Sequence, residues 1–190
     1  MGSAPLVRDR LFYNDPVKTV LLGTRSAETD TLIARRRALG QDLYDEVWEG
    51  DYHMSPAAHS RHGIVDAEVM GALRAHAKRA TLRGIGPFNL GSSADYRVPD
   101  GGFLRFTPVG VWVPTATIVL EVVSPDDETF EKFGFYSRHG VEEIVVADPA
   151  THRVRFFARD GRGGEVYEEV AASAILGVTS AEIEAEVDWP

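Results

Sequence analysis

Two apolar, strand-like segments separated by one helical segment constrain the fold more than any other feature of this 190-residue chain. The first is the run of β-branched and aliphatic residues ATIVLEVVS (116–124), and the second is EIVVAD (143–148). Such runs are typical of strands buried on both faces of a sheet. Between them, acidic residues favour a helix N-terminus near Asp127, and the helix is expected to reach His139, before Gly140. The segment therefore predicts a β-α-β unit with a parallel strand pair and a right-handed crossover.

Weaker signals on either side of this unit predict the remaining elements. Residues 1–28 are expected to form an N-terminal extension, and residues 29–190 a single domain. The expected elements are a short strand at Val17–Leu22, a helix at Asp30–Leu39 capped by Thr29 or Asp30, a hairpin turning at Glu49-Gly50-Asp51, a helix from Ser55-Pro56 to about Arg83, hairpins between Gly84 and Val113, a strand over VRFFAR (154–159) and a final strand at Val178–Val187. Together they predict an α/β fold, a mixed β-sheet with flanking helices.

Composition limits the classes of function. The chain contains no cysteine, which excludes disulfides, thiolate chemistry and cysteine-ligated zinc and is compatible with the cytoplasm, the expected location. No apolar run approaches the roughly 20 residues of a membrane helix, and the N-terminus lacks the apolar core of a signal peptide, so no membrane partner is expected. Composition alone favours an enzyme that acts on a small molecule.

The net charge of −9 argues against a protein that binds nucleic acid over its whole surface. Any contact with DNA must come from a local basic patch or from bound cations that offset acidic residues. The most basic segment is the end of the helix expected before Gly84, with Arg74, Lys78, Arg79 and Arg83. A solvated helix face is the favoured interpretation of these four residues, and a phosphate-facing patch is the alternative.

Glu121 is the most informative residue, because it lies inside the apolar run Ile118–Val123. A buried, unpaired carboxylate costs several kcal/mol, so such a group finds a salt bridge, binds a metal or shifts its pKa. Asp100 follows Pro99, and a return of about 21 residues would place its strand antiparallel to the Glu121 strand. Two carboxylates on adjacent strands form a hard-oxygen site suited to Mg²⁺ or Mn²⁺. By itself the Pro-Asp dipeptide favours a turn, because it is common there, so the pair of acidic residues counts for more than either one.

These residues resemble the PD-(D/E)xK nuclease superfamily, in which Pro-Asp precedes an acidic residue in a hydrophobic strand. The usual lysine two positions after that acid is Val123 here, so this simple motif fails. The chain instead resembles the Uma2 family of restriction endonucleases, in which Glu-Val-x-Ser-Pro is followed by a helical Lys-x-x-x-Tyr and by a Gly-Val-x-Glu strand entry that ends in Asp-Pro. The matching residues run from Leu43 to Arg159 and include Glu46, Gly50, Met54, Ser55, Pro56, His62, Glu121, Lys132, Tyr136, Gly140, Val141, Glu143, Asp148 and Pro149. Ile144-Val145 replaces the family's usual aromatic pair, and Glu128 replaces a common aspartate, so both positions depart from the pattern.

The resemblance implies a restriction-endonuclease-like core and a site in which Asp100, Glu121 and the Val122 carbonyl hold Mg²⁺ or Mn²⁺. It implies that Lys132, moved from the strand to the helix, orients water or stabilises the transition state, with Tyr136 on the same helix face. Glu46 is interpreted either as an outer acidic ligand or as a surface residue of a hairpin. His62 is interpreted as an inward-pointing residue near the site. A zinc site from His53, His59 and His62 is disfavoured because the spacing does not match a zinc motif.

The favoured function is a Mg²⁺-dependent endonuclease that hydrolyses phosphodiester bonds in DNA. Two alternatives remain open: a nuclease-like fold that binds or interacts with weak or no catalysis, and a hydrolase of a smaller phosphodiester. A homodimer is expected by analogy, because paired sites favour cleavage of both strands.

Overall fold

A computed structural model describes residues 19–21, 26–56, 58–124, 128–159 and 166–190 of the chain. The strands are β1 (Thr19–Leu21), β2 (Glu46–Trp48), β3 (Asp51–Met54), β4 (Arg83–Ile85), β5 (Asn89–Ser92), β6 (Asp95–Arg97), β7 (Gly101–Leu104), β8 (Trp112–Val113), β9 (Ile118–Val122), β10 (Glu143–Asp148), β11 (Arg153–Arg159), β12 (Tyr167–Val170), β13 (Ala172–Ser173) and β14 (Val178–Thr179). The helices are α1 (Ala27–Ala38), α2 (Ser60–Arg79), the 3-10 helix η1 (Thr129–Lys132), α3 (Phe133–Arg138) and α4 (Ser180–Glu186). In the described ranges the strands form two six-stranded sheets and one two-stranded sheet.

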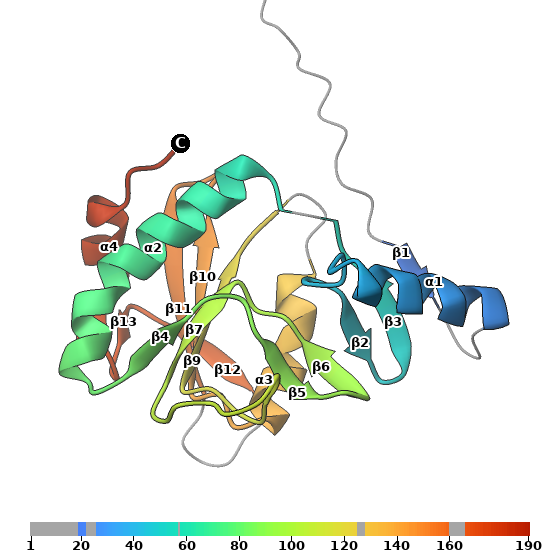
Figure 1. The fold of residues 1–190 in the computed structure, drawn as a ribbon. Coiled ribbons are helices and arrows are strands. Elements are labelled where there is room, and N and C mark those ends of the chain that lie inside the picture. The colour runs from blue at the N-terminus through green and yellow to red at the C-terminus, as the bar shows by residue number, and fades with distance from the viewer. Residues whose placement is uncertain (1–18, 22–25, 57, 125–127, 160–165) are drawn as a thin grey trace, which may run out of the picture.

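The larger core lies around the sheet with strand order β12-β11-β10-β9-β7-β4. Strands β9 and β10 pair in parallel around η1 and α3, which confirms the predicted β-α-β unit, and the other pairs of this sheet are antiparallel. One buried cluster joins this sheet to α2 and α4, and a second joins its other strand residues to α3. The sheet therefore has helices on both faces (Figure 1), which confirms the predicted mixed α/β architecture.

Alternation along β9 sets the direction of its side chains. Ile118, Leu120 and Val122 belong to the cluster with α2, whereas Val119 belongs to the cluster with α3. Because side chains alternate along a strand, Glu121 falls on the same face as Val119, toward α3. The carboxylate is thus directed at the helix that follows it in the chain.

The second six-stranded sheet has the order β1-β3-β2-β6-β5-β8 and carries its own small core against α1. Asp45, which is fully buried, links α1 to the β2–β3 hairpin. Its carboxylate accepts hydrogen bonds from the Arg36 guanidinium, the Tyr52 hydroxyl and the Ser55 backbone N–H. The hairpin β2–β3 is thereby fixed relative to α1.

The chain passes from one sheet to the other at Val98–Asp100, between β6 and β7. Strand β7 pairs antiparallel with β9 in the register Gly101↔Leu120, as the sequence predicted for the Asp100 strand. A Cβ on Gly102 would lie 2.5 Å from the Ile118 carbonyl oxygen, so only glycine permits this approach of the two backbones. Asp100 therefore lies at the junction of both sheets, at the end of β9 where Glu121 lies.

Several predicted boundaries are confirmed. The hairpin turns at Glu49 and Gly50, which both have positive φ. The predicted start of the first helix is wrong, because Ser26, and not Thr29 or Asp30, is the N-cap of α1, which begins at Ala27. Val65, Val69 and Leu73 lie at helical spacing on α2 and are fully buried, as a helix packed against the sheet requires. Strand β11 covers the predicted third strand. A short strand within residues 17–22 is present as β1, but residues 1–18 lie outside the described part of the chain.

Three predictions are wrong in detail. Helix α2 begins at Ser60 with His59 as its N-cap rather than at Ser55, because the Ser55 N–H is held by Asp45 at the end of β3. It ends at Arg79, and Arg83 is part of β4. The segment expected as one helix to His139 is a 3-10 turn followed by the short α3, with Asp127 outside the described residues.

The expected final strand at Val178–Val187 is also wrong, because only Val178 and Thr179 are extended and α4 follows. Thr179 and Glu182 form a reciprocal capping box that starts this helix. Ile183 and Val187 are buried while Ala185 between them is exposed, which fits helical spacing and not alternation along a strand.

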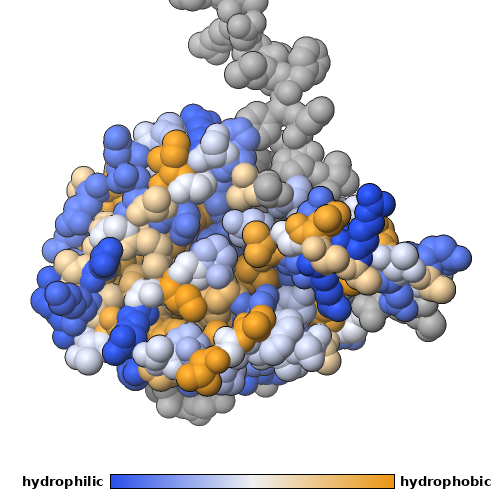
Figure 2. Space-filling view, in the orientation of Figure 1, coloured by the Kyte–Doolittle hydropathy of each residue, from blue (hydrophilic) through white to orange (hydrophobic). Residues whose placement is uncertain are grey.

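On the face seen in Figure 2, apolar residues lie in separate small groups among hydrophilic ones. The most exposed large apolar side chains include Val109 and Val111, in the loop between β7 and β8. No helix in the described part of the chain has the length and apolar character needed to cross a bilayer.

Candidate active site

A buried lysine joins three elements at the junction of the sheets. Lys132, the last residue of η1, is 9% exposed, and its Nζ lies 3.1 Å from Glu46 Oε1 and 3.2 Å from Glu121 Oε2. Glu46 and Glu121 are themselves 2% and 3% exposed. Lys132 therefore pairs with the strand carboxylate of Glu121 and is not a solvated surface residue.

Tyr136 lies one helical turn after Lys132 and shares its direction. Its hydroxyl donates a hydrogen bond to Glu121 Oε1, and its side chain is fully buried. Glu121 therefore receives donors from both residues of the Lys-x-x-x-Tyr pattern. These contacts fix the orientation of the carboxylate.

Glu46 is not a surface residue of its hairpin. Besides Lys132, its Oε1 accepts the backbone N–H of Val98 at 2.8 Å, and its Oε2 accepts the indole Nε1–H of Trp48 at 2.6 Å. The residue thus links β2, the passage between the two sheets, and η1.

Asp100 is held by two donors. Its Oδ2 accepts the backbone N–H of Val122 at 2.7 Å, and its Oδ1 lies 2.8 Å from His62 Nε2. The other imidazole nitrogen of His62 lies 3.1 Å from the Ser124 hydroxyl, at the end of β9. His62 thus points inward from α2, and it positions Asp100 beside the backbone that follows Glu121. The Val122 carbonyl, the third expected ligand, lies on the same residue whose N–H binds Asp100.

Burial dominates the electrostatics of the site. It raises the pKa of Glu121 to about 8, although the Lys132 ammonium acts in the opposite direction. Burial alone would lower the pKa of Lys132, but the carboxylates of Glu121 and Glu46 raise it above its usual value. Burial and the neighbouring Glu121 carboxylate raise the pKa of the Tyr136 hydroxyl. Lys132 faces two carboxylates, so it remains protonated even when Glu121 takes up a proton.

The donor set fits a hard divalent cation in an open site. Asp100, Glu121 and a backbone carbonyl supply oxygen ligands only, as Mg²⁺ and Mn²⁺ prefer. Among the described residues, no three His, Cys, Asp or Glu side chains converge closely enough to form a complete metal cage. Mg²⁺ is commonly held by one or two carboxylates with several retained waters, which agrees with such a partial set.

The histidines do not gather at one point. His53 stacks on the Trp48 ring, His59 caps α2, and His62 contacts Asp100. Each has a different structural contact.

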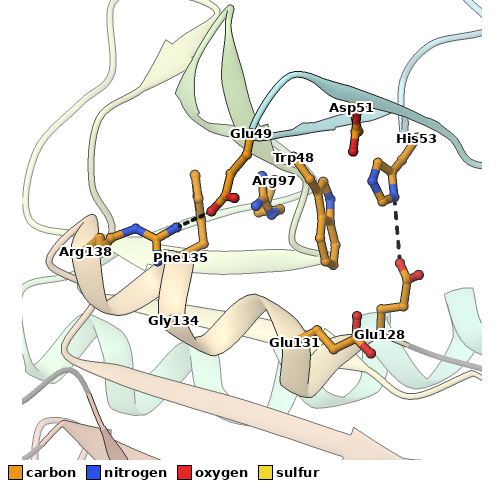
Figure 3. Close-up of a pocket in the computed structure, with 10 residues that line it drawn as sticks. All are labelled: Trp48, Glu49, Asp51, His53, Arg97, Glu128, Glu131, Gly134, Phe135 and Arg138. Atoms are coloured by element: carbon orange, nitrogen blue, oxygen red, sulfur yellow. Dashed lines mark ion pairs between the residues drawn. The ribbon is translucent and has the colours of Figure 1, made fainter. Parts of the chain in front are cut away.

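A cavity of about 630 Å³ adjoins the site, between the β2–β3 hairpin and η1–α3. One wall is a stack in which the Arg97 guanidinium lies 4.3 Å from the Trp48 ring and 4.2 Å from the Phe135 ring (Figure 3). Four acidic residues line the cavity against two arginines: Glu49, Asp51, Glu128 and Glu131 against Arg97 and Arg138. This acidic lining does not suit a phosphate group.

The sequence did not identify three residues beside the site: Trp48, Ser124 and Asp66. Trp48 donates to Glu46, and Ser124 contacts His62. Asp66 lies four residues after His62 on α2, so helical spacing was the one signal that could have placed it. Glu143, a residue of the family pattern, lies elsewhere: it accepts bonds from Ser173, Ala174 and Ile175 and holds the turn before β14.

A protein-family model described as "Putative restriction endonuclease" matches residues 36–184, and this match covers all the residues of the site. The chain belongs to the Uma2 family. The restriction-endonuclease-like fold and the family resemblance predicted from the sequence are therefore confirmed. No curated protein matches the chain.

A solved structure shares the fold. It is the crystal structure of a "putative nuclease" from Anabaena variabilis ATCC 29413, with a TM-score of 0.60 and 13% sequence identity. The match covers 75% of this chain and 90% of the other. At this identity the similarity shows a shared fold only, and the chemistry of this Uma2 protein depends on its own residues.

Proposed function

We propose that this Uma2 protein is a divalent-metal-dependent endonuclease that hydrolyses phosphodiester bonds in DNA. The observation that carries the proposal is the buried pair of Lys132 and Glu121 beside Asp100, which immediately precedes β7, the strand paired with β9. An ion-paired lysine next to two carboxylates at the end of a central strand supplies both a cation site and a positive charge for a phosphate.

Each residue has a distinct role in this proposal. Asp100, Glu121 and the Val122 carbonyl would hold Mg²⁺ or Mn²⁺, which lowers the pKa of a bound water and neutralises charge on the phosphate. Lys132 acts as a fixed positive charge rather than as a general base, because two carboxylates keep it protonated. It stabilises negative charge that develops on the scissile phosphate.

The supporting residues orient this set. Glu46 holds Lys132 from the side opposite Glu121, Tyr136 orients Glu121, and His62 orients Asp100. Such partners restrict the side chains to one arrangement before the substrate binds. We expect their loss to lower turnover without removing the cation ligands.

The proposal also includes a homodimer and a cytoplasmic location. Cleavage of both strands of a duplex benefits from two active sites, which a twofold dimer provides. A cysteine-free chain is compatible with a reducing compartment. Sedimentation measurements with and without DNA test the dimer directly.

The decisive experiment is a cleavage panel of double-stranded DNA, single-stranded DNA, RNA and a small phosphodiester, each with Mg²⁺, with Mn²⁺ and with EDTA. Cleavage of DNA that requires metal and is lost in Asp100→Ala is the expected result. Cleavage of the small phosphodiester alone would mean that the substrate is a smaller phosphodiester and not DNA. Metal binding with no cleavage of any substrate would instead favour a nuclease-like binding protein.

A further inference from the structure

Asp66 is a carboxylate of α2 that the roles described above do not use. It lies four residues after His62, so both side chains emerge on the same face of the helix, about 5–6 Å apart at their Cβ atoms. His62 contacts Asp100 from this face. Asp66 is therefore directed toward the same end of β7 and β9 as the candidate metal ligands.

One oxygen of Asp66 lacks what a buried carboxylate needs. Its Oδ1 is buried, and no hydrogen-bond partner for this atom exists among the described residues. A buried polar atom without a partner destabilises the folded protein, and more so when it is charged. Burial, followed by the nearby Asp100 carboxylate, raises the pKa of Asp66 to about 6, and His62 acts in the opposite direction. An unpaired buried carboxylate oxygen destabilises the folded protein, so we expect a cation or a hydrogen-bond donor to bind it.

The contacts of the neighbouring residues limit what can bind Asp66 Oδ1. Asp66 has no ion pair within the described ranges, and His62 already uses both ring nitrogens, on Asp100 and Ser124. Direct coordination together with Asp100 and Glu121 would require three convergent carboxylates, and no such group is found among the described residues. A water on the cation reaches further, because a metal–oxygen distance of about 2.1 Å is extended by a hydrogen bond of about 2.7 Å.

We propose that Asp66 is a further metal-positioning residue, whose Oδ1 accepts a hydrogen bond from a water bound to the divalent cation held by Asp100 and Glu121. The inference rests on the proposed function, because it requires a cation at that site. Water bound to a cation is a strong donor, so it satisfies the buried oxygen and places a third negative charge near the ion. Asp66 thus raises the affinity for the metal without being one of its ligands.

The test is calorimetric titration of Mn²⁺ into the wild type, Asp66→Asn and Glu68→Gln. Glu68 removes the same charge from the same helix, but it lies two residues away, on a different face, where it contacts the Asp188 backbone. Loss of an outer contact to a metal commonly costs about 10–100-fold in affinity. We expect this loss in Asp66→Asn, with unchanged stoichiometry, and an affinity within about twofold of wild type in Glu68→Gln.

The stability of each variant in EDTA is measured in parallel and shows that the proteins are folded. Asp66→Asn is expected to be at least as stable as the wild type without metal, because the unpaired charge is gone. Wild-type Mn²⁺ affinity in Asp66→Asn overturns the inference and leaves the proposed function intact. An affinity as low as that of Asp100→Ala also overturns it, because that is the result for a direct ligand. Absence of Mn²⁺ binding in the wild type would overturn both the inference and the proposed metal site.

Discussion

Glu46 and Lys132 form a buried ion pair of 3.1 Å that joins β2 of one sheet to η1 beside the other. The pair lies 86 residues apart in sequence but at the centre of the candidate site. Glu46 also accepts hydrogen bonds from Val98 and Trp48, so its removal leaves these two donors without their acceptor and Lys132 with Glu121 alone.

The first prediction concerns the stability contributed by this pair. Breaking a buried ion pair by removing one partner costs about 3–5 kcal/mol. Glu46→Ala should lower the free energy of unfolding in urea by about this amount. Glu49→Ala, which removes an exposed glutamate paired with Arg138, is the control and should change it by less than about 0.5 kcal/mol. Equal stability of the two variants would show that the Glu46 contacts do not hold the junction.

The second prediction separates the role of Lys132 from that of the ligands. Lys132→Ala should keep the increase in melting temperature produced by Mn²⁺ and lose turnover by about a hundredfold or more. Lys132→Arg should recover little, because a planar guanidinium cannot replace a compact ammonium between two carboxylates. Thermal shift and single-turnover cleavage measure the two effects. Full activity of Lys132→Ala would mean that the lysine serves only the fold.

The third prediction concerns pH and the metal-free protein. The pKa of Glu121 is raised from its usual 4.5 to about 8, so between these values the folded state binds more protons than the unfolded state. The contribution of Glu121 to the free energy of unfolding is therefore fully present below pH 4.5 and is lost as the pH rises toward 8. In EDTA, Glu121→Gln should show a smaller fall in unfolding free energy across this range than the wild type. Identical pH dependence would contradict the strong effect of burial on Glu121.

The fourth prediction concerns how an acidic chain contacts DNA. Arg74, Lys78, Arg79 and Arg83 are exposed at the far end of α2 and at β4. If this segment contacts phosphates, Lys78→Ala should weaken DNA binding and reduce the slope of log K against log salt by about 0.9. Mn²⁺ affinity should not change. Arg153→Ala, at an exposed position in β11 paired with Glu184, is the control. No difference between the two variants would support a merely solvated helix face.

The sequence predicted the centre of the fold well, for a physical reason. Strands β9 and β10 are buried on both faces, so their composition alone identified them, and Glu121 stood out because a carboxylate in such a run needs a partner. Lys132 was assigned to the site through the family resemblance, because helix propensity does not distinguish it from other lysines. Its environment depends on Glu46, which comes from a different sheet, and no local pattern reports that proximity.

Other features depended on tertiary contacts. The start of α2 was misplaced because Ser55, a good N-cap by type, is held by Asp45 instead. The C-terminal helix was missed although Thr179 and Glu182 have the spacing of a capping box. Asp66 could not be distinguished from an ordinary helix residue, because its distinctive property is an oxygen buried without a partner, which only a three-dimensional arrangement reveals. The proposed division into an extension of 28 residues and one domain remains a prediction.

The central claim is that Asp100 and Glu121 hold one divalent cation, and an anomalous difference map from crystals soaked in Mn²⁺ tests it most directly. We predict one strong peak per chain, coordinated by a carboxylate oxygen of Asp100, a carboxylate oxygen of Glu121 and the Val122 carbonyl, and absent in Asp100→Ala. A peak confined to the acidic cavity beside Glu128 and Glu131, or no peak at millimolar Mn²⁺, would contradict the proposed metal site.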